Sequence, residues 1–518
     1  MPTEWLLDGQ HRHDHEETTE NNDQTPLISR ASGAEDCHDG RAPIPPTERA
    51  RKASRIIAIL CVIIVVGSAS AGFQNMSMTR IFEDVLCREY YGRISLLRAD
   101  EPIDESMCKV DAIQSKLAYL FAIMYSLNAG VSVLASLPWG IAADRIGRRP
   151  VLVLAWVGMA LAILWIMVVG WFYQTLSPKL IWLSPVAYIL GGGSPVLAAL
   201  VNSIVTDSVP ESERSINFMR IHGASMVGNL ISPALASLMM SWTGPWLPLF
   251  VSFLLTALPA PFMFLLPETL KRTEAEESSR GPESDMVKRS LRQSLAELKK
   301  SADIFNSLSM SMILLITMMQ LSLVICTFQF LSQFASKRYG IPLADTGYIQ
   351  SLYGLVFIGV SFFFMPFVAS VVLKPYMPAC MRFRNDKRRD LFLARASYLI
   401  SMLGTVVMGL SPRLEGFVCG LVLMAFGVSA EGFMKNIATL YATAEQRSRL
   451  FTILGLSAIG GDIWISTALA KLFELGMGLG GSWIGLPYLG VSVVCCLMFG
   501  MSLLVKLPGS YRDRGIAC

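Results

Sequence analysis

Twelve apolar runs recur along this chain, and each is long enough to cross a lipid bilayer as a helix. A spanning helix needs about 20 mostly apolar residues, and a soluble core does not repeat runs of this length. The pattern therefore predicts an all-α membrane protein with twelve transmembrane helices. The predicted runs are 56–79, 116–138, 150–173, 180–205, 216–241, 246–266, 306–334, 344–373, 391–411, 416–440, 450–473 and 485–507.

The composition agrees with a bilayer as the surrounding medium. Hydrophobic residues make up 53% of the chain and charged residues only 16%, whereas soluble domains carry about 25% charged residues. So few charges cannot cover several globular domains, which excludes a soluble enzyme. The net charge of +4 lacks the basic excess that nucleic-acid binding requires, so nucleic acid is not an expected partner.

The sequence lacks the residue patterns of metal, cofactor and enzyme sites. Its ten cysteines contain no CxxC pair of the kind that indicates zinc or dithiol chemistry. The apolar runs hold no His-rich box, no GxSxG and no paired acids for catalysis. We expect no metal, no cofactor and no enzymatic activity.

Polar segments divide the twelve runs into two groups of six. Residues 1–50 are rich in Asp, Glu, Asn, Thr and Pro, and their low apolar content predicts a disordered cytosolic tail. An N-terminal bundle of six helices is expected over 51–270 and a C-terminal bundle over 306–507. Residues 271–305 form the linker between the bundles, and 508–518 form a short cytosolic tail.

The linker carries apolar residues at roughly helical spacing. Met286, Leu291, Leu295 and Leu298 follow Asp285, which is a suitable helix cap. This spacing favours an amphipathic helix that lies on the membrane surface.

The distribution of Lys and Arg predicts the orientation in the membrane. Basic clusters precede the first run or connect even-numbered to odd-numbered runs, as at 51–55, 145–149, 271–300, 374–395 and 447–449. Loops rich in Lys and Arg stay on the cytosolic side. Both termini are therefore expected in the cytosol, with the loop 80–116 on the opposite side.

Two localisations agree with this topology. The plasma membrane is the first expectation. Residues 23–28 read DQTPLI, which resembles the acidic dileucine signal of endosomal and vacuolar sorting, so the vacuolar membrane stays an alternative. We expect the protein to act as a monomer.

Cys87 and Cys108 both fall in the first non-cytosolic loop. That side of a membrane is the compartment in which disulfides form. A disulfide between these two residues is expected, and two free thiols are the alternative.

The two groups of runs contain related sequences at equivalent places. Residues 206–218 read TDSVPESERSINF after the fourth run, and residues 439–451 read TLYATAEQRSRLF after the tenth. They share Thr, Arg-Ser and Phe at a constant offset of 233 positions. Paired six-helix repeats of this kind are found in secondary transporters.

The loop between the second and third runs, residues 140–150, reads GIAADRIGRRP. It resembles the signature G-x-x-x-D-R-x-G-R-[RK] of the major facilitator superfamily at every defining position. The resemblance implies two six-helix bundles and a loop that latches them on the cytosolic side, as a gate and not a substrate site. From the residue types, Gly140 permits close helix approach and Asp144 can accept charged hydrogen bonds. The gating residues so implied are Gly140, Asp144, Arg145, Gly147, Arg148 and Arg149.

Further residues narrow the resemblance within that superfamily. Residues 266–269 read LPET, which is similar to the ending of the sixth helix in fungal facilitators. The glycine-rich fourth run and the following VNSIVTDSVPESERS resemble the proton-coupled folate transporter type. Drug/proton antiporters usually carry an Arg in the fourth helix, and 180–205 has none; the helix-five element of those antiporters is reduced to Gly223, Gly228 and Ser232-Pro233.

Charged residues inside the runs are the proton-coupling candidates. A charge near the bilayer centre costs at least about 2.5 to 3.5 kcal/mol, so such residues usually face a cavity. Asp462 lies halfway along the eleventh run and is the first candidate, with a structural hydrogen bond as the alternative. Glu431 and Lys435 are four residues apart in the tenth run, which predicts an ion pair that is either a clamp or a substrate contact. His222 is either a proton carrier or a residue at headgroup level.

Neutral amides supply the substrate-cavity candidates. In the superfamily that the loop resembles, helices one, four, seven and ten line the cavity. This implies cavity roles for the amides of those helices and structural roles for Asn128 and Asn229. The cavity candidates are the amides Gln74, Asn202, Gln329 and Gln333, together with the cation Lys435.

These observations together predict a secondary active transporter for a small organic solute, coupled to protons. Fungal chains that this one resembles often export secondary metabolites. A nutrient uptake permease is one alternative. A receptor with a transporter fold and no net transport is another, because fold does not determine function.

Overall fold

The computed structural model describes residues 46–93, 104–209, 211–263, 307–365, 367–368, 386–427, 430–441 and 447–508. The chain divides into a short unit, Met1–Lys52, and a large unit, Ala53–Cys518, to which the following description applies. Residues 1–45 of the predicted tail 1–50, the linker helix in 271–305 and residues 509–518 of the predicted tail 508–518 lie outside the described residues. The prediction of disorder is wrong for 46–50, because α1 already begins at Pro46.

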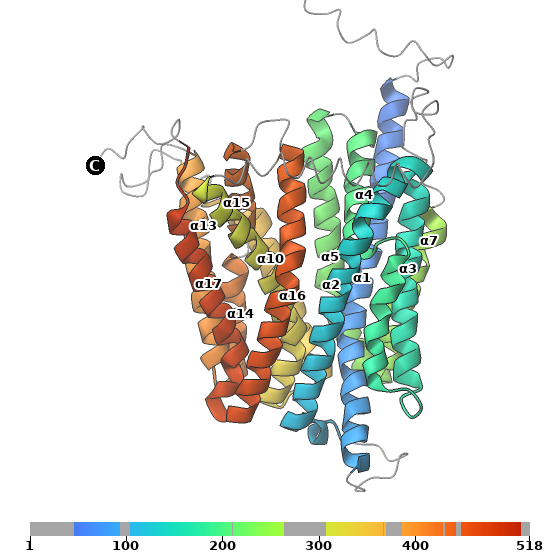
Figure 1. The fold of residues 1–518 in the computed structure, drawn as a ribbon, viewed down its shortest axis with the longest axis vertical. Coiled ribbons are helices and arrows are strands. Elements are labelled where there is room, and N and C mark those ends of the chain that lie inside the picture. The colour runs from blue at the N-terminus through green and yellow to red at the C-terminus, as the bar shows by residue number, and fades with distance from the viewer. Residues whose placement is uncertain are drawn as a thin grey trace, which may run out of the picture. The chain divides into compact units, whose positions relative to one another are not determined.

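The described part of the large unit is helical throughout (Figure 1). The N-terminal half, coloured blue to green, contains α1 (Pro46–Arg93), η1 (Glu105–Lys109), α2 (Asp111–Ile146), α3 (Arg148–Trp171), η2 (Pro178–Ile189), α4 (Gly193–Ser208), α5 (Glu211–Thr243), α6 (Trp246–Ala257) and α7 (Pro259–Phe262). The C-terminal half, coloured yellow to red, contains α10 (Leu308–Tyr339), η5 (Leu343–Asp345), α11 (Thr346–Gly359), η6 (Val360–Phe364), α13 (Asp386–Leu410), α14 (Leu414–Gly427), α15 (Ala430–Ala438), η8 (Thr439–Tyr441), α16 (Arg447–Leu479), η10 (Gly481–Gly485) and α17 (Leu486–Leu504).

Each of the twelve predicted apolar runs coincides with a helical segment. Among the described residues, ten helical segments are long and apolar enough to cross a membrane. The sixth run is occupied by the shorter apolar segment Trp246–Phe262, and the eleventh by α16. The predicted all-α membrane fold is therefore confirmed.

The exposed surface of the helices is apolar in a way that suits lipid. Leu134, Trp242 and Trp464 each leave more than three quarters of their side chain exposed. Large apolar side chains that point outward are stable when hydrocarbon and not water surrounds them.

The first helix is longer than the sequence pattern predicts. The apolar run ends at residue 79, but α1 continues to Arg93, so the prediction of a loop from residue 80 is wrong over this stretch. The reason is that 80–93 is packed against other elements and pairs its own charges. Phe82, Glu83 and Val85 are all buried, and the ion pairs Arg80–Glu83 and Arg88–Asp84 form within the helix, three and four residues apart.

The fourth run is broken into two helices by three glycines with positive φ. Gly191 has a φ of 86°, a conformation that favours glycine. A Cβ at this position would also collide with the backbone of Ala155 on α3. The break therefore brings η2 and α4 into close contact with α3.

Two helix pairs join the halves of the large unit: α2 packs against α16 (Figure 1), and α5 packs against α11. The second seam is tight because small residues face each other. A Cβ at Gly347 on α11 would collide with the carbonyl oxygen of Pro233 on α5 and with the hydroxyl of Ser237. The halves therefore meet along two continuous seams.

Candidate functional site

The helices begin and end at two opposite ends of the large unit, and functional side chains gather at both. We call one the loop-motif end, because it holds the turn at Gly147 between α2 and α3. We call the other the disulfide end, because it holds the Cys87–Cys108 bond, η1 and η5.

At the loop-motif end, Gly147 makes the turn from α2 to α3. Its φ is 114°, and its N–H donates to the carbonyl oxygen of Ala143 at 3.2 Å. A residue with a Cβ would be strained here. The glycine of the loop motif is therefore required by the backbone itself.

Arg148, the first residue of α3, connects α3 to α4. Its guanidinium donates to the carbonyl oxygen of Ser203 at 2.9 Å and forms an ion pair with the carboxylate of Asp207. The sequence indicates that the arginines pair with acids, but it does not single out Asp207. This partner is 59 residues away along the chain, so no local pattern reveals it.

The other residues of the loop motif have different surroundings. Arg145 is exposed and Arg149 is half-buried. Asp144 lies in the last turn of α2, and the structure describes its backbone but not its side chain. A Cβ at Gly140 would meet nothing within 4 Å, so the interpretation that Gly140 permits close helix approach is wrong for this conformation.

The C-terminal half has a matching contact between α13 and α15. Asp390 is buried, pairs with Arg389 at 2.7 Å, and accepts a hydrogen bond from the amide of Asn436 at 2.7 Å. Asn436 lies 233 positions after Ser203, which is the offset of the sequence repeat. In both halves, the same position therefore joins the third helix of the bundle to the fourth.

Glu431 and Lys435 form the ion pair that their spacing predicts. Both lie on α15, four residues apart. The side chain of Glu431 is 28% exposed and that of Lys435 is 40% exposed, so neither is fully buried. Both side chains of the pair are therefore partly accessible from outside the packed helices.

The seventh and eleventh runs meet near the centre of the C-terminal half. A Cβ at Gly461 on α16 would collide with the carbonyl oxygen of Met318 on α10. Ser466, one turn after position 462, donates to the side-chain oxygen of Gln329 at 3.1 Å. The amide nitrogen of Gln329 is buried and has no hydrogen-bond partner among the described residues. The side chain of Asp462 lies outside the described residues.

The remaining predicted residues are spread over different environments. Gln74 on α1 is half-buried, and Asn202 on α4 and His222 on α5 are exposed. Gln333 is buried at the disulfide end, where it contacts the other half. The structure therefore does not bring these four residues together.

An aromatic row on α10 and α11 adds residues that the sequence analysis did not single out. The ring of Tyr353 lies 4.5 Å from that of Phe328 and 6.1 Å from that of Phe357. The Tyr353 hydroxyl is buried without a hydrogen-bond partner among the described residues. Aromatic rings in membrane helices are common, so sequence alone had no signal for this row.

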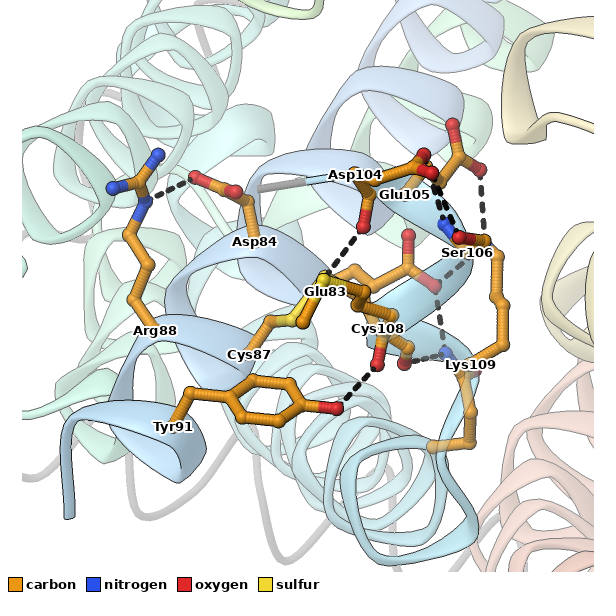
Figure 2. Close-up of a disulfide and its surroundings, with 12 residues drawn as sticks. Glu83, Asp84, Cys87, Arg88, Tyr91, Asp104, Glu105, Ser106, Cys108 and Lys109 are labelled. Atoms are coloured by element: carbon orange, nitrogen blue, oxygen red, sulfur yellow. Dashed lines mark hydrogen bonds and ion pairs between the residues drawn. A yellow bond between two sulfur atoms is a disulfide. The ribbon is translucent and has the colours of Figure 1, made fainter. Parts of the chain in front are cut away.

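At the disulfide end, a bond between Cys87 and Cys108 ties α1 to η1 (Figure 2). The Cα atoms are 5.3 Å apart, within the usual range for a disulfide. The Tyr91 hydroxyl adds a hydrogen bond to the carbonyl oxygen of Met107 at 3.1 Å. The short η1 helix is thereby held against α1.

Glu83 is the most buried acid at this end, with 1% of its side chain exposed. Its carboxylate accepts hydrogen bonds from Arg80 at 3.0 Å, Lys109 at 2.7 Å and Gln114 at 2.6 Å (Figure 2 labels Glu83 and Lys109). A buried charge is stable only when it is paired and hydrogen-bonded in this way. Sequence analysis missed Glu83 because it follows the end of the apolar run.

Glu105 on η1 links the N-terminal half to the C-terminal half. Its carboxylate accepts the backbone N–H of Leu343 at 2.8 Å and pairs with Lys109 at 2.9 Å. Burial by itself would raise its pKa. Lys109, the Leu343 N–H and Arg80 together outweigh burial and hold the pKa of Glu105 below its ordinary value.

Three further contacts cross between the halves at the disulfide end. Lys337 of α10 pairs with Asp111 at 2.6 Å and donates to the carbonyl oxygen of Lys109. Gln333 donates to the carbonyl oxygen of Gln114 at 2.6 Å. We call these residues the inter-half cluster; it comprises Arg80, Glu83, Glu105, Lys109, Asp111 and Gln114 of the N-terminal half and Gln333, Lys337 and Leu343 of the C-terminal half.

Comparison with known proteins gives concordant results. The family model described as Major Facilitator Superfamily matches residues 113–469. The chain is 28% identical to the MFS efflux pump atnC of Emericella nidulans, over 90% of each chain. It is 25% identical to the efflux pump ustT of Aspergillus flavus, covering 81% of this chain and 82% of that one.

Solved structures resemble this fold at low sequence identity. The nucleoside transporter NupG matches with a TM-score of 0.59 at 12% identity, over 87% of this chain and 98% of that chain. A bacterial homolog of the human lysosomal transporter Spinster matches with a TM-score of 0.57 at 14% identity, over 89% and 98%. At these identities the likeness concerns the fold.

Proposed function

The chain belongs to the Major Facilitator Superfamily, and from this premise we propose that it exports a small organic solute by alternating access. It is a secondary transporter, as the match to the family indicates. Relatives that align over most of their length are named efflux pumps, and this is the observation that carries the direction of transport. A fungal secondary metabolite is the proposed class of cargo.

The polar contacts support a conformation that is closed at the disulfide end. There, the inter-half cluster holds the two bundles together by hydrogen bonds and ion pairs. At the loop-motif end, Arg148–Asp207 and Asn436–Asp390 each lie within one bundle. In the proposed cycle, the bundles part at the disulfide end and approach at the loop-motif end, where Asp144 and the arginines latch them.

The proposed substrate path lies between the halves and includes groups that can bind an amphipathic solute. Gln329 offers an amide nitrogen without a partner among the described residues, and Tyr353 offers a hydroxyl beside two other rings. Glu431 and Lys435 add a partly exposed ion pair. These groups suit a planar or aromatic solute with hydrogen-bonding groups.

The orientation follows from compartment chemistry and from loop charge. A disulfide persists on the non-cytosolic side, so the disulfide end faces outward and the Arg-rich loop-motif end faces the cytosol. We place the protein in the plasma membrane as a monomer with both termini cytosolic. Labelling of the variant Arg292→Cys by an impermeant thiol reagent added to intact cells would contradict this topology.

Proton coupling is proposed to use Asp462, with Glu431 and His222 as the next candidates. An acid in a membrane helix exchanges a proton when its hydration changes between two conformations. The test uses reconstituted vesicles with an imposed proton gradient and a panel of labelled aromatic and aliphatic organic solutes. Gradient-driven accumulation of at least one solute is expected for the unchanged protein.

The variant Asp462→Asn mimics the protonated acid and sharpens this test. Accumulation against a gradient should be abolished, while counterflow exchange, which needs no net proton movement, should survive. Glu474→Gln is the matched control, because Glu474 is an exposed acid on the same helix. Normal pH-driven accumulation in Asp462→Asn would remove this residue from the mechanism.

A further inference from the structure

We propose that Glu83 is a positioning residue for transport: its buried carboxylate organises the closed disulfide end by holding the two residues whose carbonyl oxygens bind the other half. The role in transport rests on the proposed function. The closure itself is a property of the structure and is measured without any solute.

Glu83 lies at the centre of the polar network on the N-terminal side. Its carboxylate is almost fully buried and accepts hydrogen bonds from Arg80, Lys109 and Gln114. Two cations and one amide are thereby directed to a single carboxylate. Because all three donors reach the same carboxylate, the network favours one arrangement of its members, although the side-chain oxygen of Gln114 is buried without a hydrogen-bond partner among the described residues.

Lys109 and Gln114 each make two kinds of contact. Their side chains donate to the same oxygen of Glu83, at 2.7 and 2.6 Å. Their backbone carbonyl oxygens accept hydrogen bonds from Lys337 and Gln333 of the other half. The side-chain contacts to Glu83 therefore fix the two acceptors that α10 binds.

The segment between these two residues is fixed from both sides. Gln114 also donates to the carbonyl oxygen of Cys108 at 3.0 Å, and Cys108 is bonded to Cys87 (Figure 2). Asp104 caps the start of η1 by accepting from the N–H and the hydroxyl of Ser106. The disulfide and the carboxylate of Glu83 thus both hold the segment 108–114 against α1, and Glu83 provides the charged contact.

The contacts that Glu83 supports are the ones that must break when the halves separate. Lys337 and Gln333 belong to α10 and move with the C-terminal half, whereas Glu83, Lys109 and Gln114 move with the N-terminal half. Removing the carboxylate leaves Lys109 and Gln114 without a common acceptor. The carbonyl oxygens of Lys109 and Gln114 then lose their fixed positions. The free energy that favours the closed over the open arrangement becomes smaller.

The test measures opening directly with a thiol probe in the seam between α5 and α11. Ser237 is fully buried and lies against Gly347, outside the inter-half cluster. The variant Ser237→Cys is made in purified, lipid-embedded protein that retains only Cys87 and Cys108 of its own cysteines. The rate of modification by a polar maleimide reports how often the disulfide end opens.

Glu83→Gln is expected to raise the modification rate about tenfold, because losing a charged hydrogen-bond network shifts a two-state equilibrium by roughly that factor. Glu83→Asp, which keeps the charge, should recover part of the closure. The matched control is Asp84→Asn. Asp84 is the next acid on α1 and pairs only with Arg88 among the contacts described, so its rate should equal that of the parent.

A double-mutant cycle separates positioning from a general loss of stability. Lys337→Ala should also raise the modification rate, and adding Glu83→Gln to it should raise the rate by less than the product of the two single effects, since both act on the carbonyl oxygen of Lys109. Fully multiplied effects, or an unchanged rate in folded Glu83→Gln, would overturn the proposal. If Glu83→Gln does not fold, the comparison of Glu83→Asp with Lys337→Ala decides by the same criterion.

Failure of the proposed function is distinguishable from failure of this inference. If the unchanged protein moves no solute but Glu83→Gln still opens the seam, the positioning role holds and the transport role does not. If transport is present and the seam rate stays unchanged in Glu83→Gln, the positioning role is overturned alone.

Discussion

The two ends of the large unit use similar residues in different ways. At the disulfide end, ion pairs and hydrogen bonds connect one half to the other, as Lys337–Asp111 and Gln333–Gln114 do. At the loop-motif end, Arg148–Asp207 and Asn436–Asp390 connect helices of the same half. Contacts between halves set which end is closed, whereas contacts within a half keep that bundle rigid while it moves.

The difference teaches that an ion pair cannot be assigned a role from its residue types. Arg148 and Lys337 are both half-buried cations, and each pairs with a carboxylate and donates to a backbone carbonyl oxygen. The two contacts differ in where the partner lies. A partner in the same half stabilises that half, whereas a partner in the other half holds the two halves together. Substitutions at the two ends should therefore have different effects on opening.

The largest effect is expected from removal of the disulfide. The double variant Cys87→Ser/Cys108→Ser should lose about 3 kcal/mol of folding stability, since the bond closes a loop of about 20 residues. It should also open the disulfide end, because η1 loses its anchor on α1. Thermal unfolding and the modification rate of Ser237→Cys measure the two effects. An unchanged opening rate would mean that η1 does not need its anchor for closure.

Two glycine substitutions compare a tightly packed position in the α5–α11 seam with an open position near the loop-motif end. Gly347→Ala should cost about 1 to 3 kcal/mol by overpacking, because its Cβ would collide with Pro233 across the halves. Gly140→Ala should cause no loss of stability, because its Cβ has open space and Ala is a better helix former than Gly inside α2. Since modification of Ser237→Cys would be affected directly by a neighbouring substitution, the readouts are unfolding temperature and transport rate. Equal costs at the two glycines would break the comparison.

The brace at the loop-motif end gives an intermediate effect. Arg148→Gln should lower stability by about 1 to 2 kcal/mol through loss of a charged hydrogen bond. It should leave the modification rate of Ser237→Cys unchanged, because the contact to Asp207 lies within the N-terminal half. A raised rate comparable to that of Lys337→Ala would show that the brace also acts between halves.

The smallest effect is a pH dependence at Glu105. Its pKa is lowered in the folded protein, so its contribution to stability is present above the ordinary Glu pKa of about 4.3. That contribution is lost as the pH falls through the lower folded pKa. Thermal unfolding between pH 6 and pH 3 should reveal this loss, and Glu105→Gln should flatten it. A profile that Glu105→Gln leaves unchanged would assign the acid sensitivity to another carboxylate.

The sequence alone predicted the all-α membrane fold and the family, and both predictions are confirmed. Apolar runs of bilayer length are local features, and the backbone inside a bilayer has to be helical, so their number and order are readable without tertiary contacts. The loop motif at 140–150 is equally local. Its Gly147 has the positive φ that the turn between α2 and α3 requires. The Cys87–Cys108 bond was also predicted, because the expected topology placed both cysteines in one non-cytosolic loop, although Cys87 lies on α1.

The tertiary structure decided which polar residues meet. Gln333 and Gln114 are 219 residues apart, and Lys337 and Lys109 are 228 apart, so no spacing rule relates them. Glu83 was overlooked because the hydropathy pattern predicts that the first helix ends at residue 79. Packing and ion pairs after that residue extend the helix to Arg93. The sequence determines how long each helix can be in lipid. Only packing of the two halves decides whether a buried charge braces one bundle or closes the path between two.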